Sequence, residues 1–83
     1  MRFMITFRSI TPSQKAEQLL QRKGIDCQVH RTPRWMEEQG CGYSLHIRGG
    51  DIYGIIAQLQ ESNIAYRKIY LLRPNGKIEE LTV

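Results

Sequence analysis

Apolar residues recur at every second position in three short stretches of the chain, which is the spacing of strands with one buried face. The alternating positions are Phe3, Ile5 and Phe7, then Ile25, Cys27 and Val29, then Tyr43, Leu45 and Ile47. A fourth strand is expected over Tyr66–Leu72, and a strong turn signal follows at Arg73-Pro74-Asn75-Gly76. This turn predicts that Ile78–Val83 returns as a short fifth strand.

Two stretches between these strands repeat their apolar residues every three to four positions, which predicts helices. Thr11 is expected to cap the first helix, with Pro12 at its first helical position, and Gly24 is expected to end it. Asp51 is expected to cap the second helix. The apolar stripes are Ala16, Leu19 and Leu20 in the first helix and Ile52, Ile55, Ile56 and Leu59 in the second.

The predicted order is strand, helix, strand, strand, helix, strand, followed by a terminal hairpin. Right-handed crossovers make the first two strands run the same way. The arrangement that satisfies both crossovers is an α+β, ferredoxin-like β-α-β-β-α-β sandwich with two helices on one face of an antiparallel sheet. We expect a single domain over residues 1–83, with a core at 1–72 and a C-terminal hairpin extension at 73–83. This fold serves many unrelated functions, so function must be argued from particular residues.

Charge and composition exclude several classes of function. The 83 residues carry 12 Lys and Arg against 8 Asp and Glu, a net charge of +4 spread along the chain without a block of like charges. Such dispersed basicity usually forms a solvated surface, so nucleic acid is not expected as the main partner. No apolar stretch approaches the roughly 18 residues that cross a bilayer, and the first residues resemble a strand rather than a signal peptide. The two cysteines are therefore expected to be free thiols in the cytoplasm.

Cys41 is placed where a cysteine can meet another molecule. It lies between Gly40 and Gly42, at the end of a polar loop and directly before a strand. Neighbours without side chains leave a thiol open on both sides and let another backbone approach closely. The alternative is that the two glycines serve only the turn into the strand.

The predicted topology gives Cys41 basic surroundings. The loop over residues 31–41 leaves the sheet at the end where the first strand finishes and the first helix begins. A helix N-terminus and nearby cations both favour a thiolate, so we expect the pKa of Cys41 to lie below its usual value. The alternative is that the loop holds Cys41 away from the helix and leaves an ordinary thiol. The residues expected at this end are Arg8, Ser9, Thr11, Ser13 and Arg67.

Cys27 is expected to behave differently from Cys41. It alternates with two aliphatic residues, so it should face the core as an inert packing residue, near the other end of the sheet. A disulfide between the two cysteines is therefore not expected. Cys27, His30, Cys41 and His46 have a spacing reminiscent of zinc ligands, but Cys27 and His30 point to opposite faces of a strand. We expect no metal, and no phosphate loop or nucleotide motif predicts a cofactor.

Four segments together resemble the small bacterial proteins known as selenium/sulfur carrier-like proteins. They are Phe7-Arg8-Ser9, the helix segment Lys15-Ala16-Glu17-Gln18-Leu19-Leu20, Thr32-Pro33-Arg34, and Gly40-Cys41-Gly42-Tyr43-Ser44-Leu45. The resemblance runs over residues 1–72, and its most specific part is the Thr-Pro-Arg segment followed by Cys-Gly. It implies that Cys41 holds a sulfur or selenium atom, without turnover as an enzyme.

On this hypothesis the Cys41 thiolate takes a sulfur or selenium atom from the persulfide of a sulfurtransferase or cysteine desulfurase and passes it to an acceptor protein. Exchange of this kind needs an accessible thiolate and a leaving sulfur. The terminal anion would be neutralised by arginines and would accept hydrogen bonds from serines and helix amides. The candidate arginines are Arg8, Arg34 and Arg67, and the candidate serines are Ser9 and Ser13.

Two other classes of function stay open. A ferredoxin-like sheet exposes one face, which here would carry Met4, His30, His46, Tyr70 and Leu72, and such a face commonly pairs with a second copy or binds RNA. The strands lack the aromatic signature of RNA-binding sheets, so we favour a homodimer. An enzyme with Cys41 as covalent nucleophile would need a base, and no histidine is placed by sequence to serve as one. Trp35 either anchors a partner or folds back over the domain edge.

Overall fold

The computed structural model describes residues 2–32 and 42–82, which form two helices and five strands. The α+β class and the order of elements agree with the sequence prediction. Gly40, Cys41, Arg34 and Trp35 lie outside the described residues. The elements are β1 (Arg2–Phe7), α1 (Ile10–Arg22), β2 (Asp26–Arg31), β3 (Tyr43–Arg48), α2 (Ile52–Glu61), β4 (Ile69–Leu72) and β5 (Ile78–Leu81). None of the helices in the described ranges is both long enough and apolar enough to cross a membrane.

The five strands form one open sheet in the order β2-β3-β1-β4-β5, and every neighbouring pair is antiparallel. β1 and β2 both pair with β3, so they run in the same direction. Phe7 at the end of β1 and Arg31 at the end of β2 both lie opposite Tyr43. The ends of β1 and β2 and the start of β3 therefore meet at one end of the sheet, which we call the Gly42 end after the residue that precedes β3.

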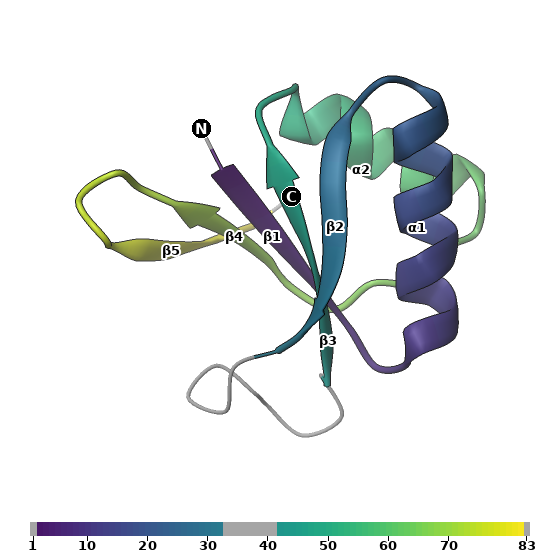
Figure 1. Ribbon diagram of the computed structural model, residues 1–83, viewed down its shortest axis with the longest axis horizontal. Coiled ribbons are helices and arrows are strands. Elements are labelled where there is room, and N and C mark those ends of the chain that lie inside the picture. The colour runs from purple at the N-terminus through teal and green to yellow at the C-terminus, as the bar shows by residue number, and fades with distance from the viewer. Residues whose placement is uncertain (1, 33–41, 83) are drawn as a thin grey trace.

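Both helices pack on one face of the sheet, and Figure 1 shows them on the same side of it. The core between the layers is built from alternate strand residues and the apolar helix stripes, because only one face of each strand is turned toward the helices. Its fully buried members include Ile5, Phe7, Ala16, Leu20, Leu45, Ile47 and Leu59. On the other sheet face, which we call the outer face, Met4, Thr6 and Ser44 are also buried.

The predicted start of α1 is wrong by two residues. The helix begins at Ile10, and Ser9, with its extended backbone, occupies the cap position that we had assigned to Thr11. Pro12 consequently lies at the third helical position. The first four amides of a helix have no partner within it, so proline fits anywhere in the first turn and cannot fix the start. The predicted end is confirmed, because Gly24 has a φ of +80° and the Ile25 amide donates to the Leu20 carbonyl.

The start of α2 is confirmed, since the Asp51 side chain accepts a hydrogen bond from the Tyr53 amide at 3.1 Å. The helix ends in the same manner as α1, with Asn63 in place of glycine at a φ of +54°. Here the Ile64 amide donates to the Leu59 carbonyl, and Ile64 is buried. This hydrogen bond turns the chain back under the sheet toward β4.

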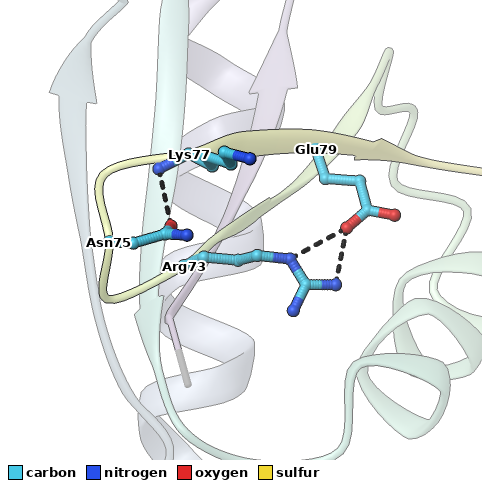
Figure 2. Close-up of polar contacts among 4 residues, drawn as sticks. All are labelled: Arg73, Asn75, Lys77 and Glu79. Carbon is cyan, nitrogen blue, oxygen red and sulfur yellow. Dashed lines mark hydrogen bonds and ion pairs between the residues drawn. The ribbon is translucent and has the colours of Figure 1, made fainter.

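The predicted terminal hairpin is present, and β5 pairs with β4. Gly76 has a φ of +86°, and its amide donates to the Arg73 carbonyl, which closes the turn. Figure 2 shows that the Arg73 guanidinium reaches the Glu79 carboxylate, with Nη2 at 2.7 Å, and that the Lys77 amide donates to Asn75 Oδ1. Local turn chemistry and the Arg73–Glu79 ion pair thus help to hold a hairpin that is mostly exposed.

Candidate functional site

The Gly42 end of the sheet is closed by backbone hydrogen bonds on both sides of residues 33–41. The Thr32 amide donates to the Gly42 carbonyl at 3.0 Å, which continues the pairing of β2 with β3. Gly42 is the residue that follows Cys41 in the chain. The described residue nearest in sequence to the candidate cysteine is therefore fixed at the end of the sheet where β1 finishes.

The start of α1 lies next to this end, because two residues separate it from Phe7. Ser9 occupies the cap position, but its hydroxyl makes no capping hydrogen bond, and the first turn contains no acidic residue. The amides of this turn, with the partial positive charge of the helix terminus, are thus not neutralised by the helix itself. Ser13 is placed differently: it is buried, and its hydroxyl donates to the Ile10 carbonyl at 2.6 Å. Thr11 is exposed on the first turn.

A bulge at the beginning of β4 sets the position of Arg67. The regular strand starts at Ile69, three residues later than predicted. Before it, the Thr6 amide donates to the Lys68 carbonyl, while the Thr6 carbonyl accepts from the Arg67 amide at 2.8 Å. The Lys68 amide donates to Thr6 Oγ1 at 3.0 Å. Two successive residues therefore oppose one residue of β1, which breaks the alternation and re-aims the side chains that precede β4.

These elements enclose a shallow hollow of about 390 Å³ beside the start of α1, which we call the helix-start hollow. Arg8 and Arg67 are exposed in it, and neither forms an ion pair with an acidic side chain of the described residues. The side-chain amide of Gln60 in α2 donates a hydrogen bond to the Tyr66 hydroxyl at 3.3 Å, which ties this tyrosine to the helix. The hollow is lined by Arg8, Ser9, Pro12, Ala65, Tyr66 and Arg67.

Of the site residues predicted from sequence, the structure brings Arg8, Ser9 and Arg67 together in this hollow. Thr11 and Ser13 do not line it, although both belong to the same helix turn. Two guanidinium groups, an unused hydroxyl and a helix N-terminus can together stabilise an anion by charge and hydrogen bonds. The described residues of this hollow therefore favour a bound anion.

Thr32 is a candidate that sequence reasoning did not identify as functional. Thr32 is 6% exposed and its amide donates to the Gly42 carbonyl, while its buried Oγ1 has no hydrogen-bond partner among the described residues. A buried hydroxyl without a partner costs about 1–3 kcal/mol. The Thr32 hydroxyl is not needed to pair the ends of β2 and β3. It could therefore hydrogen-bond to a partner molecule that binds at the Gly42 end. The sequence signal was its place in the Thr32-Pro33-Arg34 segment.

Gly42 can be tested separately from the fold. A Cβ added at residue 42 would meet no heavy atom of the described residues within 4 Å, apart from its chain neighbours, and the φ of Gly42 lies outside the left-handed range that favours glycine. We expect Gly42→Ala to change the free energy of unfolding by less than about 0.5 kcal/mol in urea denaturation. If the small residue instead serves the approach of a partner to Cys41, the same variant should slow the reaction of the Cys41 thiol with that partner. A loss of stability above about 1 kcal/mol would instead show that the glycine serves the turn.

Cys27 is confirmed as a core residue. It is 5% exposed on the helix side of β2, and its thiol donates weakly to the Glu17 carbonyl of α1 at 3.7 Å. Burial raises the pKa of the Cys27 thiol from 9.0 to about 11, and the negative charges of Glu17 and Asp26 contribute further. A thiol with this pKa is almost entirely protonated near neutral pH, so Cys27 is a poor nucleophile.

The neighbouring contacts of α1 protect the edge of the sheet. Glu17 Oε2 accepts the Val29 amide at 2.8 Å, and the Gln21 side chain donates to the Cys27 carbonyl. These are backbone groups on the free side of edge strand β2. A covered edge does not pair with another chain.

The two histidines lie on the outer face of the sheet, away from Cys27. Their rings are perpendicular, with centroids 4.8 Å apart, and Ser44 Oγ lies 3.2 Å from His46 Nε2. Within residues 2–32 and 42–82, no group of three or more His, Cys, Asp or Glu side chains could hold a metal ion. The zinc set considered from sequence therefore has Cys27 and the histidines on opposite faces.

A family model described as "Putative Se/S carrier protein-like" matches residues 2–71. The match contains both helices and strands β1 to β3, and it stops within β4, so β5 lies beyond it. No curated protein and no solved structure matches the chain.

Proposed function

Because this chain belongs to the Se/S carrier protein-like family, we propose that it holds a sulfur or selenium atom on Cys41 and passes it between proteins. The observation that carries the proposal is the helix-start hollow. Two guanidinium groups that form no ion pair with any described residue lie at the same end of the sheet as Gly42, the neighbour of Cys41, together with a helix N-terminus that no Ser9 side chain caps. Covalent connection to Gly42 keeps the proposed carrier residue near that end.

The transfer step needs no oxidant or reductant. The Cys41 thiolate attacks the terminal sulfur of a donor persulfide, a new S–S bond forms on Cys41, and the donor's S–S bond breaks. The donor leaves as a thiolate, and Cys41 retains the terminal sulfur. Delivery to an acceptor thiolate repeats the same exchange in the other direction. For selenium, the transferred atom forms a selenosulfide on Cys41.

The described residues supply the electrostatic part of this mechanism. Arg8 and Arg67 would stabilise the terminal anion, and Ser9 would donate a hydrogen bond to it. The amides of the first turn of α1 would add the helix-terminus contribution. Arg34 is proposed as a third cation, and Gly40 and Gly42 as the flanks that let a partner approach. Ser13 is an unsuitable donor, because its hydroxyl is already bonded to the Ile10 carbonyl.

The proposal implies a reducing compartment and two protein partners. A free thiol persists in the cytoplasm, where a cysteine desulfurase or sulfurtransferase can act as the donor. We also propose the ferredoxin-like class for the fold, which the strand order β2-β3-β1-β4 and the two helices on one face support.

We retain the homodimer through the outer face as a separate proposal. Its apolar contribution would come from Leu72 and Ile78, since Met4 is 1% exposed. A two-fold contact there would bring Arg2 and Arg48 of two copies together, which opposes association. The carrier proposal does not require the dimer.

Sulfur loading can be measured by intact-protein mass spectrometry after incubation with a cysteine desulfurase and cysteine. We expect wild type to gain the mass of one sulfur atom, which a reductant removes. Cys41→Ser should gain none, because it lacks the attacking thiolate. Cys27→Ser is the matched control, and it should load like wild type, since Cys27 is buried and protonated. The proposal fails if wild type gains no adduct or if Cys41→Ser gains it equally.

A further inference from the structure

A second basic cluster lies on the outer face, at the end of the sheet opposite Gly42. The pairing of β1 with β3 places Arg2 directly opposite Arg48. Like charges at directly opposed positions destabilise a sheet. Both arginines are exposed, and within the described residues neither forms a hydrogen bond or an ion pair with a carboxylate. Their guanidinium groups are therefore free to bind an anion.

The two histidines extend this cluster along the same face. His46 lies two residues before Arg48 on β3, and His30 contacts its ring from β2. Burial lowers the pKa of His46, and the charges of His30 and Arg2 lower it further. Arg2 and His46 are diagonal neighbours on the paired strands β1 and β3, so the guanidinium charge acts on the imidazole. Ser44 engages His46 Nε2, which leaves Nδ1 of that ring for another partner.

These four side chains line a single hollow of about 420 Å³, which we call the arginine hollow. Two carboxylates line it as well. Glu17 is occupied through Oε2 by the Val29 amide, and Asp26 lies opposite Arg48 without forming an ion pair. Lys68, which precedes β4, and Glu80 of β5 lie 3.4 Å apart and offset one another's charge. The hollow thus combines two guanidinium groups and two imidazoles with two carboxylates, neither of which pairs with Arg2 or Arg48.

We propose that the arginine hollow binds a small divalent oxyanion, such as sulfate or a phosphate group, between the Arg2 and Arg48 guanidinium groups and the His46 imidazole. A doubly charged oxyanion offers several acceptor oxygens, which match guanidinium donors from two strands. It also relieves the repulsion between the opposed arginines. The site is separate from the proposed carrier site, since Arg2 and Phe7 are five positions apart along β1, or about 17 Å.

Binding should depend on pH. A bound anion favours the protonated form of His46 and raises its pKa, and linkage then requires affinity to rise as pH falls through the histidine range. The other charged groups that line the hollow with His46 are Arg2, Arg48, Glu17 and Asp26. Sulfate is a suitable probe because it remains a dianion over this range. We expect tighter binding at about pH 6 than at about pH 8.

The test is a titration of the full chain with sodium sulfate at constant ionic strength, followed by the NMR signals of His30 and His46. Wild type should saturate. Arg2→Gln and Arg48→Gln should each weaken binding about 5- to 10-fold, because each loses a charge-assisted contact. Asp26→Asn should tighten it by removing a negative charge. Lys15→Gln on α1 is the charge-matched control, since Lys15 is exposed on the other side of the sheet, and it should change binding less than about twofold.

Three results would overturn the proposal. Shifts that grow linearly with sulfate, or an equal loss in Lys15→Gln, would mean that the anion acts only through general charge screening. Saturation by a short single-stranded RNA but not by sulfate would identify a nucleic-acid surface instead. Sulfur loading on Cys41 is measured independently, so failure of the anion site and failure of the carrier proposal are distinguishable.

Discussion

Cys27 in the folded protein should react with iodoacetamide about 100-fold more slowly than an ordinary cysteine at about pH 8. The thiolate is the reacting species, and raising the pKa from 9.0 to about 11 lowers the thiolate fraction by about two powers of ten. Burial of the sulfur slows the reaction further. The rate can be measured by mass spectrometry in Cys41→Ser, where Cys27 is the remaining cysteine. Labelling in urea is the control, and it should restore an ordinary rate.

The same shift predicts a pH dependence of stability with a definite sign. The folded-state pKa is raised, so below about pH 9 the thiol is protonated in both states and costs nothing. Above it the unfolded state releases the proton first, and the free energy of unfolding should fall by about 2–3 kcal/mol between about pH 9 and pH 11. Cys27→Ala should lack this part of the decrease. An equal decrease in both proteins, or fast labelling of native Cys27, would contradict a buried thiol.

The contrast between the cysteines has a direct functional consequence. A carrier with two reactive thiols could oxidise to a disulfide or divide its cargo between two positions. The core position of Cys27 removes that competition without removing the side chain, because a protonated buried thiol packs as a small apolar group. Sulfur chemistry on this chain would then be confined to Cys41, because the Cys27 thiol is both protonated and buried.

The strand pattern could be predicted from sequence because it depends on burial, which alternates with a period of two. Ile5, Leu45 and Ile47 face the helices as their spacing requires, and Cys27 does so with them. The position of Gly42 at the end of β1 could also be predicted from sequence, because it depends only on the handedness of the two crossovers. Arg8, Ser9 and Arg67 were therefore placed at one end of the sheet before their contacts were known.

The features that could not be predicted depend on three-dimensional geometry, which the spacing of apolar residues along the chain does not determine. Ser9 and Thr11 are both good caps, and proline is accepted anywhere in the first turn, so the sequence could not fix where α1 begins. The bulge at Arg67 and Lys68 arises because the Thr6 hydroxyl competes for a backbone amide. The meeting of Arg2 and Arg48 requires the register of β1 against β3, and a shift of one residue would have separated them.

Replacing Phe7 with alanine should lower the free energy of unfolding by about 3–5 kcal/mol, the cost of emptying a large buried aromatic site. Phe7 is 0% exposed and lies at the last position of β1, opposite Tyr43 and immediately before Arg8 and Ser9. Small domains are stable by only about 5–15 kcal/mol, so urea denaturation should show a large shift of the midpoint. Tyr53→Ala is the matched control, because this aromatic is 64% exposed on α2, and its loss should cost less than about 0.5 kcal/mol.

The position of Phe7 predicts that its replacement should affect the two proposed sites differently. Phe7 anchors the strand end that carries Arg8 into the helix-start hollow, so its loss should disorder that hollow before it affects the arginine hollow at the other end of β1. Under conditions where Phe7→Ala is still mostly folded, sulfur loading should therefore fall while sulfate binding persists. Equal losses at both sites would mean that the two ends of the sheet unfold together. A cost below about 1 kcal/mol would contradict the packing of Phe7 in the core.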